Sequence, residues 1–249
     1  MSIEDFISRY VPQPTSIIQS SGIQSPNEDK STLPAESSQQ DAIRDTHLDV
    51  YSAATISDAD LEACLDLVEL TSGEAYAASG IGWSRPKKFK EMKLPDMKYL
   101  VVRGAGRTSN EPPRAEEADK PDASRGSNNS NDANTNANGV ESPGVFGFLS
   151  FMVTYEDGKE IIYCYEIHLA PAARGRGLGI MLMNRMEEIG RLVGLEKAML
   201  TVFKSNAIAR RFYERGGYEV DEYSPQPRKL RNGTIKEFDY LILSKPLRR

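Results

Sequence analysis

The stretch from Gly104 to Gly144 contains no Leu, Ile, Met, Phe, Tyr or Trp. A segment of this composition buries almost no apolar surface, so it cannot offset the conformational entropy that ordering costs. We therefore interpret it as a disordered surface insertion. Residues from Pro12 to about Thr46 are mainly Ser, Gln, Pro and acidic side chains, which predicts a disordered leader. Any folded core must come from the rest of the chain.

These two segments set the predicted domain organisation. Residues 1–46 form an N-terminal segment, in which a short docked helix is expected over 3–10. The apolar residues at helical spacing there are Ile3, Phe6, Ile7 and Tyr10. Residues 47–249 form one domain interrupted by the insertion 104–144, and the length that remains suits a single domain.

Composition argues against several functional classes. The net charge is −5 over 249 residues, which disfavours a direct reader of nucleic acid. No apolar run is long enough to cross a bilayer, and Met1 to Tyr10 lacks the pattern of a signal peptide. Cys64 and Cys164 cannot form a disulfide framework, and with His47 and His168 they make a poor metal set. We expect a soluble intracellular protein that binds neither a metal nor a membrane.

The remainder alternates between helix and strand patterns. Ser57 and Asp60 form a capping box that predicts a helix. Its apolar face comprises Leu61, Cys64, Leu65 and Val68. Two further helices are expected, at Leu178–Val193 and Asn206–Arg215. The expected strands are Tyr99–Arg103, Val145–Glu156, Glu160–Leu169, Ala198–Phe203, Tyr218–Tyr223 and Glu237–Ser244. The first two flank the insertion as a hairpin. Antiparallel strands followed by β-α-β-α-β indicate a mixed sheet of the α+β class.

The run from Arg174 to Gly179, Arg-Gly-Arg-Gly-Leu-Gly, lies between a predicted strand and a predicted helix. Backbone N–H groups at a helix N-terminus lack partners, and glycine lets a ligand approach them closely. The two arginines add positive charge, so the run suits a pyrophosphate. It is neither a Rossmann fingerprint nor a Walker loop, because Ile180 replaces the last glycine and no Gly-Lys-Ser/Thr follows. A glycine-rich turn without a ligand remains the alternative.

The neighbouring motifs resemble the acetyl-CoA core of the GNAT acetyltransferases. After the glycine-rich run come Leu-Thr-Val-Phe at 200–203, then Asn206, Ala209, Phe212 and Tyr213. In this superfamily the strand before the loop and the next parallel strand splay apart around the cofactor. Tyr-Cys-Tyr-Glu at 163–166 and Leu-Thr-Val-Phe-Lys-Ser-Asn at 200–206 are more specific. They resemble the NatD family of histone-specific N-terminal acetyltransferases over roughly residues 60–103 and 145–245.

The resemblance implies a GNAT fold, acetyl-CoA as cosubstrate and three groups of site residues. The implied cofactor contacts are His168, Leu169, Ala170, Arg174, Gly175, Arg176, Gly177, Leu178, Gly179, Asn206 and Ser224. The implied substrate contacts are Tyr76, Trp83, Glu156, Tyr165, Glu166, Thr201 and Tyr240. The implied catalytic residues are Glu166, Tyr165 and Leu169. Two departures from the family pattern are Thr154, where a second acid is expected near Glu156, and Ile81, where an aromatic is expected.

The implied reaction needs modest help from the protein. An α-amine has a pKa of about 7.7–8.0 against about 10.4 for lysine, so far more of it is a neutral nucleophile at neutral pH. Glu166 is the expected base, acting directly or through water. Backbone N–H groups near Leu169 would stabilise the oxyanion. The implied substrates are core histone tails of types four and two-A that begin Ser-Gly-Arg-Gly, with the ribosome as a further candidate partner. We expect a monomer in the cytoplasm and nucleus.

Simpler interpretations of some residues stay open. Cys164 is expected to be a buried core residue rather than an acyl-carrying nucleophile. Tyr213 either packs in the core or protonates the departing thiolate. Tyr163 and Tyr165 share one face of a strand, where one of them can be plain core. His168 is expected to face solvent rather than to act as a base.

The charge pattern and the function also leave alternatives. Lys87, Lys88 and Lys90 are interpreted as a solvated face rather than a nucleic-acid patch. The alternative functions are a GNAT enzyme for lysine or a small amine, and an acyl-CoA-binding scaffold without turnover.

Overall fold

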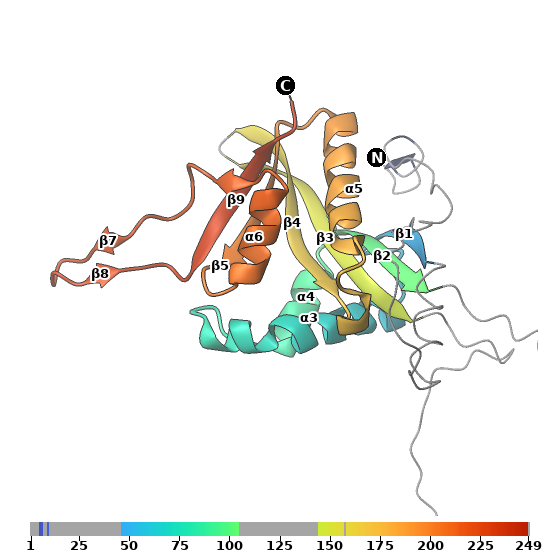
Figure 1. Ribbon diagram of the computed structural model, residues 1–249, viewed down its shortest axis with the longest axis horizontal. Coiled ribbons are helices and arrows are strands. Elements are labelled where there is room, and N and C mark those ends of the chain that lie inside the picture. Colours follow the sequence, from blue (N-terminus) through green and yellow to red (C-terminus); the bar gives the residue numbers. More distant parts are fainter. Residues whose placement is uncertain (1–4, 7–8, 10–45, 105–143, 157, 249) are drawn as a thin grey trace, which may run out of the picture.

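The computed structural model describes residues 5–6, 9, 46–104, 144–156 and 158–248. Figure 1 shows a twisted β-sheet flanked by helices, with a narrow two-stranded hairpin projecting from the body. The sheet has seven strands in the order β1-β2-β3-β4-β5-β9-β6. Their bounds are β1 Thr46–Ser52, β2 Lys98–Gly104, β3 Val145–Glu156, β4 Lys159–Leu169, β5 Lys197–Phe203, β6 Glu219–Val220 and β9 Tyr240–Pro246. Among these pairs β4 and β5 run parallel, and the others run antiparallel. The predicted mixed sheet is confirmed.

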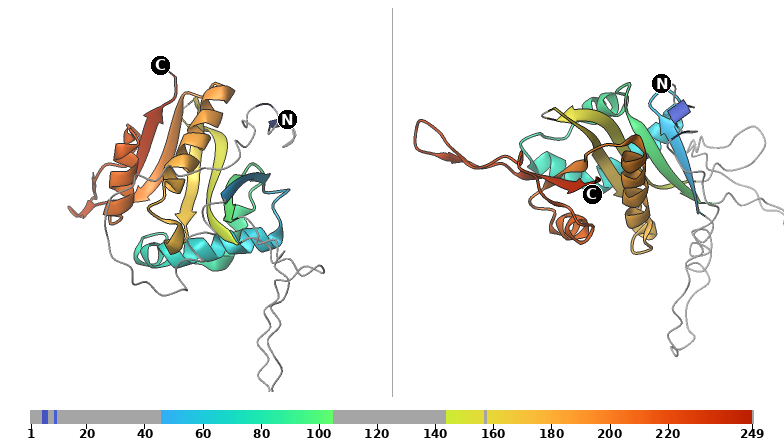
Figure 2. Two further views of the ribbon diagram at one scale, coloured as in Figure 1. Left: turned by 45° about the vertical axis from the view of Figure 1, so that its right-hand side comes forward. Right: turned by 90° about the horizontal axis from the view of Figure 1, so that it is seen from above.

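Helices cover both faces of this sheet (Figure 2). One face carries α3 (Asp58–Ala78) and α4 (Arg85–Met92). The other carries α5 (Leu178–Val193) and α6 (Ala207–Arg215). Side chains along β2 point alternately to the two faces of the sheet. Tyr99 and Val101 pack in the core under α3, and Leu100 and Val102 pack in the core under α5. A single strand thus supplies side chains to two separate apolar cores.

The predicted helix ends are found in the structure. The side chain of Ser57 accepts a hydrogen bond from Asp60 N–H and begins α3. Asn206 caps α6 in the same way, through Ala209 N–H at 3.0 Å. Gly194 ends α5 in the left-handed conformation, with φ of 88°. These local signals fix where the helices start and stop before any tertiary contact is considered.

The sequence does not predict β1, α4, the 3-10 helix η1 (Pro171–Ala173) or the two-stranded hairpin of β7 (Arg228–Lys229) and β8 (Ile235–Lys236). β1 is an edge strand of mixed burial, and α4 reads Arg-Pro-Lys-Lys-Phe-Lys-Glu-Met, so neither shows clear apolar periodicity. The strand expected at Tyr218–Tyr223 is wrong in length. Only Glu219–Val220 form a strand, β6. The strand ends there because Asp221 begins a turn in which Ser224 N–H donates to Asp221 O.

The structure describes residues next to the insertion and a few residues of the N-terminal segment. The insertion leaves and re-enters the sheet through an antiparallel pair, with Arg103 opposite Val145, as expected for a hairpin. The inserted residues themselves, and the leader up to residue 45, lie outside the described residues. Of the expected helix 3–10, Phe6 is helical and only 4% exposed in the core under α5. Ile3, Ile7 and Tyr10 also lie outside the described residues.

Candidate active site

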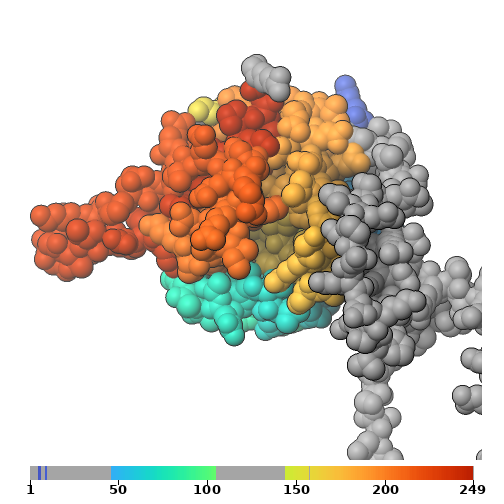
Figure 3. All heavy atoms as spheres, viewed as in Figure 1, coloured from blue at the N-terminus to red at the C-terminus, as the bar shows by residue number. Residues whose placement is uncertain are grey.

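The first feature of the site is the divergence of β4 and β5. The two strands pair only from Ile161 opposite Lys197 to Cys164 opposite Leu200. Beyond that point β4 continues beside β3 to Leu169, and β5 continues beside β9. In the space-filling view the central strands are visible at the bottom of a hollow between α6 and the start of α5 (Figure 3). The splayed parallel strands that the resemblance implied are therefore present.

The divergence leaves one edge of β4 without a partner strand. Ala170 donates its N–H to Phe146 O on β3 at 2.8 Å. Because backbone groups alternate along a strand, the N–H and C=O of Leu169 point to the opposite edge. Arg174 reaches that edge and donates from Nε to Leu169 O at 3.2 Å. The N–H of Leu169 is therefore directed into the gap between β4 and β5, as an oxyanion donor requires.

The glycine-rich run sits at the mouth of this gap. Gly175 and Gly177 have φ of 75° and 79°, in the left-handed region that favours glycine. Gly177 is the N-cap of α5 and provides no side-chain cap. The first N–H groups of α5 are thus left for an outside acceptor. Arg174 and Arg176 are exposed beside them. This donor set fits the pyrophosphate of acetyl-CoA.

The surface along α5 is hollowed next to the loop. One depression has a volume of about 420 Å³, and its lining residues are Arg176, Gly177, Ile180, Met181, Asn184, Arg185 and Glu188. A smaller cavity of about 120 Å³ lies between α5 and α6. Gly179 faces α6, where a Cβ would lie 3.4 Å from the Phe212 ring. Leu178 points into the core and is 4% exposed.

Two implied cofactor contacts also have structural partners. Asn206 uses Oδ1 to cap α6. Ser224 is 3% exposed, and its hydroxyl accepts the N–H of Ile242 on β9 at 3.1 Å. These contacts position α6 and β9 at the far side of the gap. A direct role in cofactor binding stays a prediction for both residues.

A β-bulge in β4 builds the other half of the site. Ser150 pairs with Glu166 and Phe151 with Cys164, so Tyr165 has no direct partner on β3. The extra residue resets the alternation of side chains. Tyr165 packs against the core under α3, and Glu166 bonds to Tyr76 on that helix. Two consecutive residues thus face α3, which simple alternation forbids.

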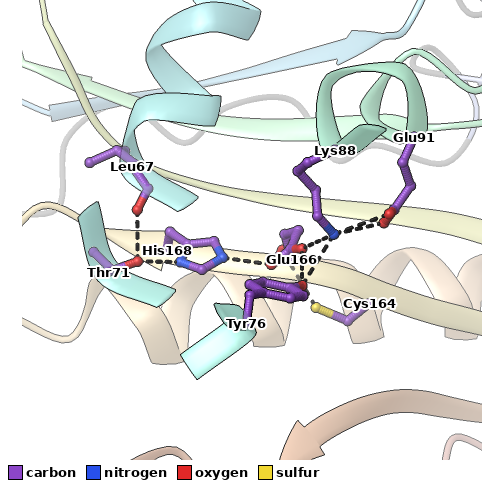
Figure 4. A network of polar contacts seen from close by, with 8 residues as sticks. All are labelled: Leu67, Thr71, Tyr76, Lys88, Glu91, Cys164, Glu166 and His168. Carbon is purple, nitrogen blue, oxygen red and sulfur yellow. Dashed lines mark hydrogen bonds and ion pairs between the residues drawn. The ribbon is translucent and has the colours of Figure 1, made fainter. Parts of the chain in front are cut away.

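Glu166 is the centre of a buried network (Figure 4). Its Oε1 accepts hydrogen bonds from Tyr76 Oη at 2.6 Å and Lys88 Nζ at 2.8 Å. Its Oε2 lies 2.6 Å from His168 Nε2, and His168 Nδ1 lies 2.5 Å from Thr71 Oγ1. Burial alone would raise the pKa of Glu166, but the hydrogen bond with His168 and the charges of His168 and Lys88 outweigh burial and lower it to about 2. The carboxylate is held in its ionised form.

Two predictions about this region are wrong. Lys88 does not lie on a solvated face, because its side chain is 9% exposed and ion-paired with Glu166. Lys87 and Lys90 are exposed as expected. His168 does not face solvent, since it is 7% exposed and packs 5.6 Å from the Phe148 ring. The bulge explains His168, because it turns the second half of β4 toward α3.

Several aromatic side chains lie near Glu166. The Tyr76 ring lies 5.7 Å from Trp83 and 5.2 Å from Phe203 at the end of β5. The rings of Tyr163 and Tyr165 lie 5.4 Å apart, tilted by 57°, on the same face, as predicted. The Tyr163 hydroxyl lies 2.5 Å from the Thr201 hydroxyl. The implied peptide wall therefore brings together Tyr76, Trp83, Tyr165, Glu166 and Thr201.

Tyr240 and Glu156 lie at the border of this group. Tyr240 pairs with Phe203 in the β5–β9 register, one strand further from Glu166. Glu156 is exposed at the end of β3, opposite Lys159. Met152 pairs with Tyr163, so alternation along β3 puts Glu156 on the same face as Tyr163. Neither residue contacts Glu166 directly among the described hydrogen bonds. Their roles stay predictions.

Two further candidates are deeply buried. Burial and the charge of Glu166 raise the pKa of the Cys164 thiol, which leaves it 3% exposed and un-ionised. The core interpretation of Cys164 is confirmed by its place in the cluster under α5. Burial likewise raises the pKa of Tyr213, which packs in the same cluster. A raised pKa makes Tyr213 a weaker acid and favours packing over proton donation.

Three residues of the site were not singled out from the sequence. The sequence predicts that Lys88 lies in solvent, and it indicates no partner for Thr71 or Phe203, which contact His168 and Tyr76. Thr71 lies two turns after Cys64 on the apolar side of α3, and this spacing is the one signal for it in the sequence. In the part of the chain that the structure describes, no cluster of three His, Cys, Asp or Glu side chains offers a metal site. The described helices likewise include none with the length and apolar character needed to cross a bilayer.

The chain is similar to known acetyltransferases. Residues 107–218 match the model of the acetyltransferase (GNAT) family. The chain is 28% identical over 187 residues to N-alpha-acetyltransferase 40 of Saccharomyces cerevisiae, an alignment covering 67% of this chain and 54% of that protein. The chain thus spans about half the length of this curated relative.

Similar solved structures include the PaiA N-acetyltransferase of Thermoplasma acidophilum in complex with coenzyme A. It is 14% identical, with 80% of this chain and 98% of that chain covered and a TM-score of 0.45. NAA60 of Arabidopsis thaliana in complex with a bisubstrate analogue is also 14% identical, with 80% and 97% covered and a TM-score of 0.47.

Proposed function

We propose that this chain, which has the GNAT fold and matches the GNAT acetyltransferase family model over residues 107–218, belongs to that family and transfers the acetyl group of acetyl-CoA to the α-amine of protein N-termini. The finer part of the proposal is that the preferred N-termini begin Ser-Gly-Arg-Gly, as in core histone tails. The similarity to N-alpha-acetyltransferase 40 and the Tyr-Cys-Tyr-Glu and Leu-Thr-Val-Phe motifs support α-amine chemistry.

One observation carries the proposal. The bulge at Tyr165 turns Tyr165 and Glu166 toward α3, while Leu169, on the same strand, directs its N–H into the gap between β4 and β5. An amine held beside Glu166 would therefore approach a thioester whose oxygen points at Leu169 N–H. The aromatic side chains around Glu166 would enclose the first residue of a peptide.

The chemistry asks little of the protein. The neutral α-amine attacks the thioester carbonyl, the new N–C bond forms, and the C–S bond breaks to release CoA, whose thiolate takes up a proton. The Leu169 N–H would stabilise the oxyanion formed on attack. Because an α-amine has a pKa of about 7.7–8.0, a useful fraction is neutral at pH 7. The negative charge of Glu166 would attract the remaining α-ammonium form to the site.

The cofactor half of the proposal rests on the loop and the gap. The N–H groups at the start of α5, with Arg174 and Arg176, would hold the pyrophosphate. The open edge of β4 would bond the pantetheine arm. Asn206, which caps α6, and Ser224, which bonds to Ile242 of β9, would add further cofactor contacts.

A peptide panel tests the proposal. Purified protein and acetyl-CoA are assayed for CoA release with peptides beginning Ser-Gly-Arg-Gly, Met-Leu and Ala-Ala, and with an N-terminally blocked Ser-Gly-Arg-Gly control that retains lysine. We expect turnover with the first peptide and none with the blocked one. Turnover with the blocked peptide would favour a lysine acetyltransferase. Acetyl-CoA binding without turnover on any amine would favour the non-catalytic scaffold.

A further inference from the structure

The buried ammonium of Lys88 is not explained by the reaction as proposed above. It comes from α4, yet its Nζ lies among side chains of α3 and β4 (Figure 4). Its three protons each have an acceptor, namely Tyr76 Oη at 3.1 Å, Glu166 Oε1 at 2.8 Å and the Glu91 carboxylate at 3.0 Å. It also lies 4.6 Å from the centre of the Tyr76 ring. A fully bonded, 9% exposed lysine is a costly feature for a surface helix to carry.

The hydrogen bonds around Glu166 have a definite direction. Tyr76 accepts from Lys88 and so donates its own proton to Glu166 Oε1. Lys88 donates to the same oxygen. Both bonds therefore use Oε1 as an acceptor, so this oxygen carries no proton. His168 lies against the other oxygen, and its second nitrogen is held by Thr71 on α3. The two carboxylate oxygens are fixed from opposite sides.

We infer that Lys88 is a positioning residue that keeps Glu166 ionised and oriented, so that Glu166 serves as a fixed negative charge at the amine site rather than as the group that accepts the amine's proton. The inference rests on the proposed function, since it assigns the part that Glu166 plays in that reaction. Glu166 has three donors on its two oxygens. The proton of the α-ammonium then leaves to water, which the nearly neutral pKa of an α-amine allows.

The groups facing Glu166 come from several elements. Those on α3 and α4 are Tyr76, Lys88 and, through Lys88, Glu91. Those on other elements are Cys164 and His168 of β4, Tyr99 of β2 and Tyr213 of α6. Burial raises the pKa of each of the three tyrosines and of Cys164, so these four stay neutral at neutral pH. Burial alone would lower the pKa of Lys88, but the charge of Glu166 outweighs it and raises that pKa. Lys88 is therefore one cation of the network, beside His168, whose charge also lowers the pKa of Glu166.

The first test reads Glu166 without any substrate. Protein labelled with ¹³C at glutamate side-chain carboxyls is titrated by NMR, and the Glu166 signal is identified by its loss in Glu166→Gln. In the parent the carboxyl should remain ionised well below pH 4.5, the ordinary value for glutamate. In Lys88→Gln, which keeps a hydrogen-bond donor but loses the charge, the midpoint should move above pH 4.5. Lys87→Met, an exposed lysine on the same helix, is the matched control and should leave the midpoint unchanged.

The second test separates position from packing. The pH dependence of kcat/KM is measured from pH 5.5 to 9 with a Ser-Gly-Arg-Gly peptide. The parent and Lys88→Arg should show one acidic limb, set by the peptide's α-amine. Lys88→Gln should lose at least about tenfold at pH 7 and gain a second, steeper acidic limb as Glu166 becomes protonated. If Lys88→Gln lowers kcat/KM by the same factor at every pH, Lys88 has only a structural role. If Lys88→Gln raises kcat at neutral pH, Glu166 is the proton acceptor.

These readouts distinguish two failures. If the protein acetylates none of the peptides but the Glu166 midpoint moves in Lys88→Gln, the proposed function is wrong and the role of Lys88 stands. If peptides are acetylated and the midpoint does not move, the role of Lys88 is overturned and the proposed function stands. Circular dichroism confirms that each variant is folded. Should Lys88→Gln fail to fold, Lys88→Met removes the same charge, and Lys88→Arg serves as the control that keeps it.

Discussion

The hydroxyl of Tyr163 on β4 lies 2.5 Å from the hydroxyl of Thr201 on β5. These residues stand on either side of the last paired position, Cys164 opposite Leu200. The bond therefore joins two strands at the point where their backbones separate. Burial raises the pKa of Tyr163 to about 12, so its hydroxyl is protonated throughout the physiological range and available as a donor. Thr201 is exposed and supplies a hydroxyl that closes the contact.

Removing one partner of this pair should cost stability. We expect Thr201→Val to lower the free energy of unfolding by about 0.5–1.5 kcal/mol, because the half-buried Tyr163 hydroxyl loses its partner. Thr201→Ser keeps a hydroxyl and should cost less. Tyr163→Phe combined with Thr201→Val should be less destabilising than the sum of the two single changes. Urea unfolding of the four proteins measures this, and strict additivity would show that the hydroxyls do not interact.

Gly177 is expected to be essential for cofactor binding. Its φ of 79° is unfavourable for any residue with a Cβ, and its carbonyl begins α5. Gly177→Val should raise the dissociation constant for acetyl-CoA at least tenfold, because it disturbs the N–H groups assigned to the pyrophosphate. Isothermal titration calorimetry gives the constant directly.

The matched control is Gly158, in the turn before β4. Its φ of 78° is nearly the same, and a Cβ there also meets nothing within 4 Å. Gly158→Val should therefore cost similar stability, at least about 1–2 kcal/mol, with no change in acetyl-CoA affinity. Equal weakening of binding by both changes would trace the effect to general destabilisation.

Glu156 is expected to read the arginine at the third position of the peptide. A charge-assisted bond of this kind is worth about 1.5–3 kcal/mol, or roughly 10- to 150-fold in kcat/KM. Glu156→Gln should lose that factor with Ser-Gly-Arg-Gly and change little with Ser-Gly-Ala-Gly. Thr154 cannot supply a second charge, so the loss should fall mainly on Glu156. Steady-state kinetics with the two peptides measure the difference.

Glu160 provides the comparison for Glu156. It is an exposed carboxylate nearby, but it pairs with Tyr155, which alternation places on the opposite face of β3. Glu160→Gln should leave both peptides unaffected. Equal losses on the two peptides for Glu156→Gln would mean that Glu156 does not recognise arginine.

The insertion should be dispensable. Arg103 and Val145 are directly paired, so the ends of β2 and β3 are already adjacent. Replacing residues 106–142 by a short Gly-Ser bridge should keep kcat/KM on the peptide within a few-fold of the parent. A folded deletion variant without activity would indicate that the insertion contributes to the substrate site.

Much of the fold is predictable because its signals are local. Val145–Glu156 matches β3 residue for residue, and the capping side chains of Ser57 and Asn206 mark two helix starts. The loop from Arg174 to Gly179 was also placed correctly between a strand and a helix. Each of these depends on neighbours within about one helical turn, which the sequence displays directly.

The missed features depend on distant partners. The bulge at Tyr165 arises from the register between β3 and β4, and no residue type in β4 predicts it. The burial of Lys88 follows, because Glu166 can meet an α4 side chain only after the bulge has turned it toward α3. A lysine-rich octapeptide gives no sign of a buried ion pair. The family resemblance identified Glu166 but not the cation that holds it.

Four residue pairs join β4 to β5, and they connect one block of four strands to another of three. Acetyl-CoA bound in the gap would contact both groups of strands. It would therefore add to the few contacts that hold β4 and β5 together. Its binding free energy would then add to the stability of the folded chain, by an amount that grows with the logarithm of its concentration. Through this short join, a higher acetyl-CoA concentration would keep a larger fraction of the chain folded.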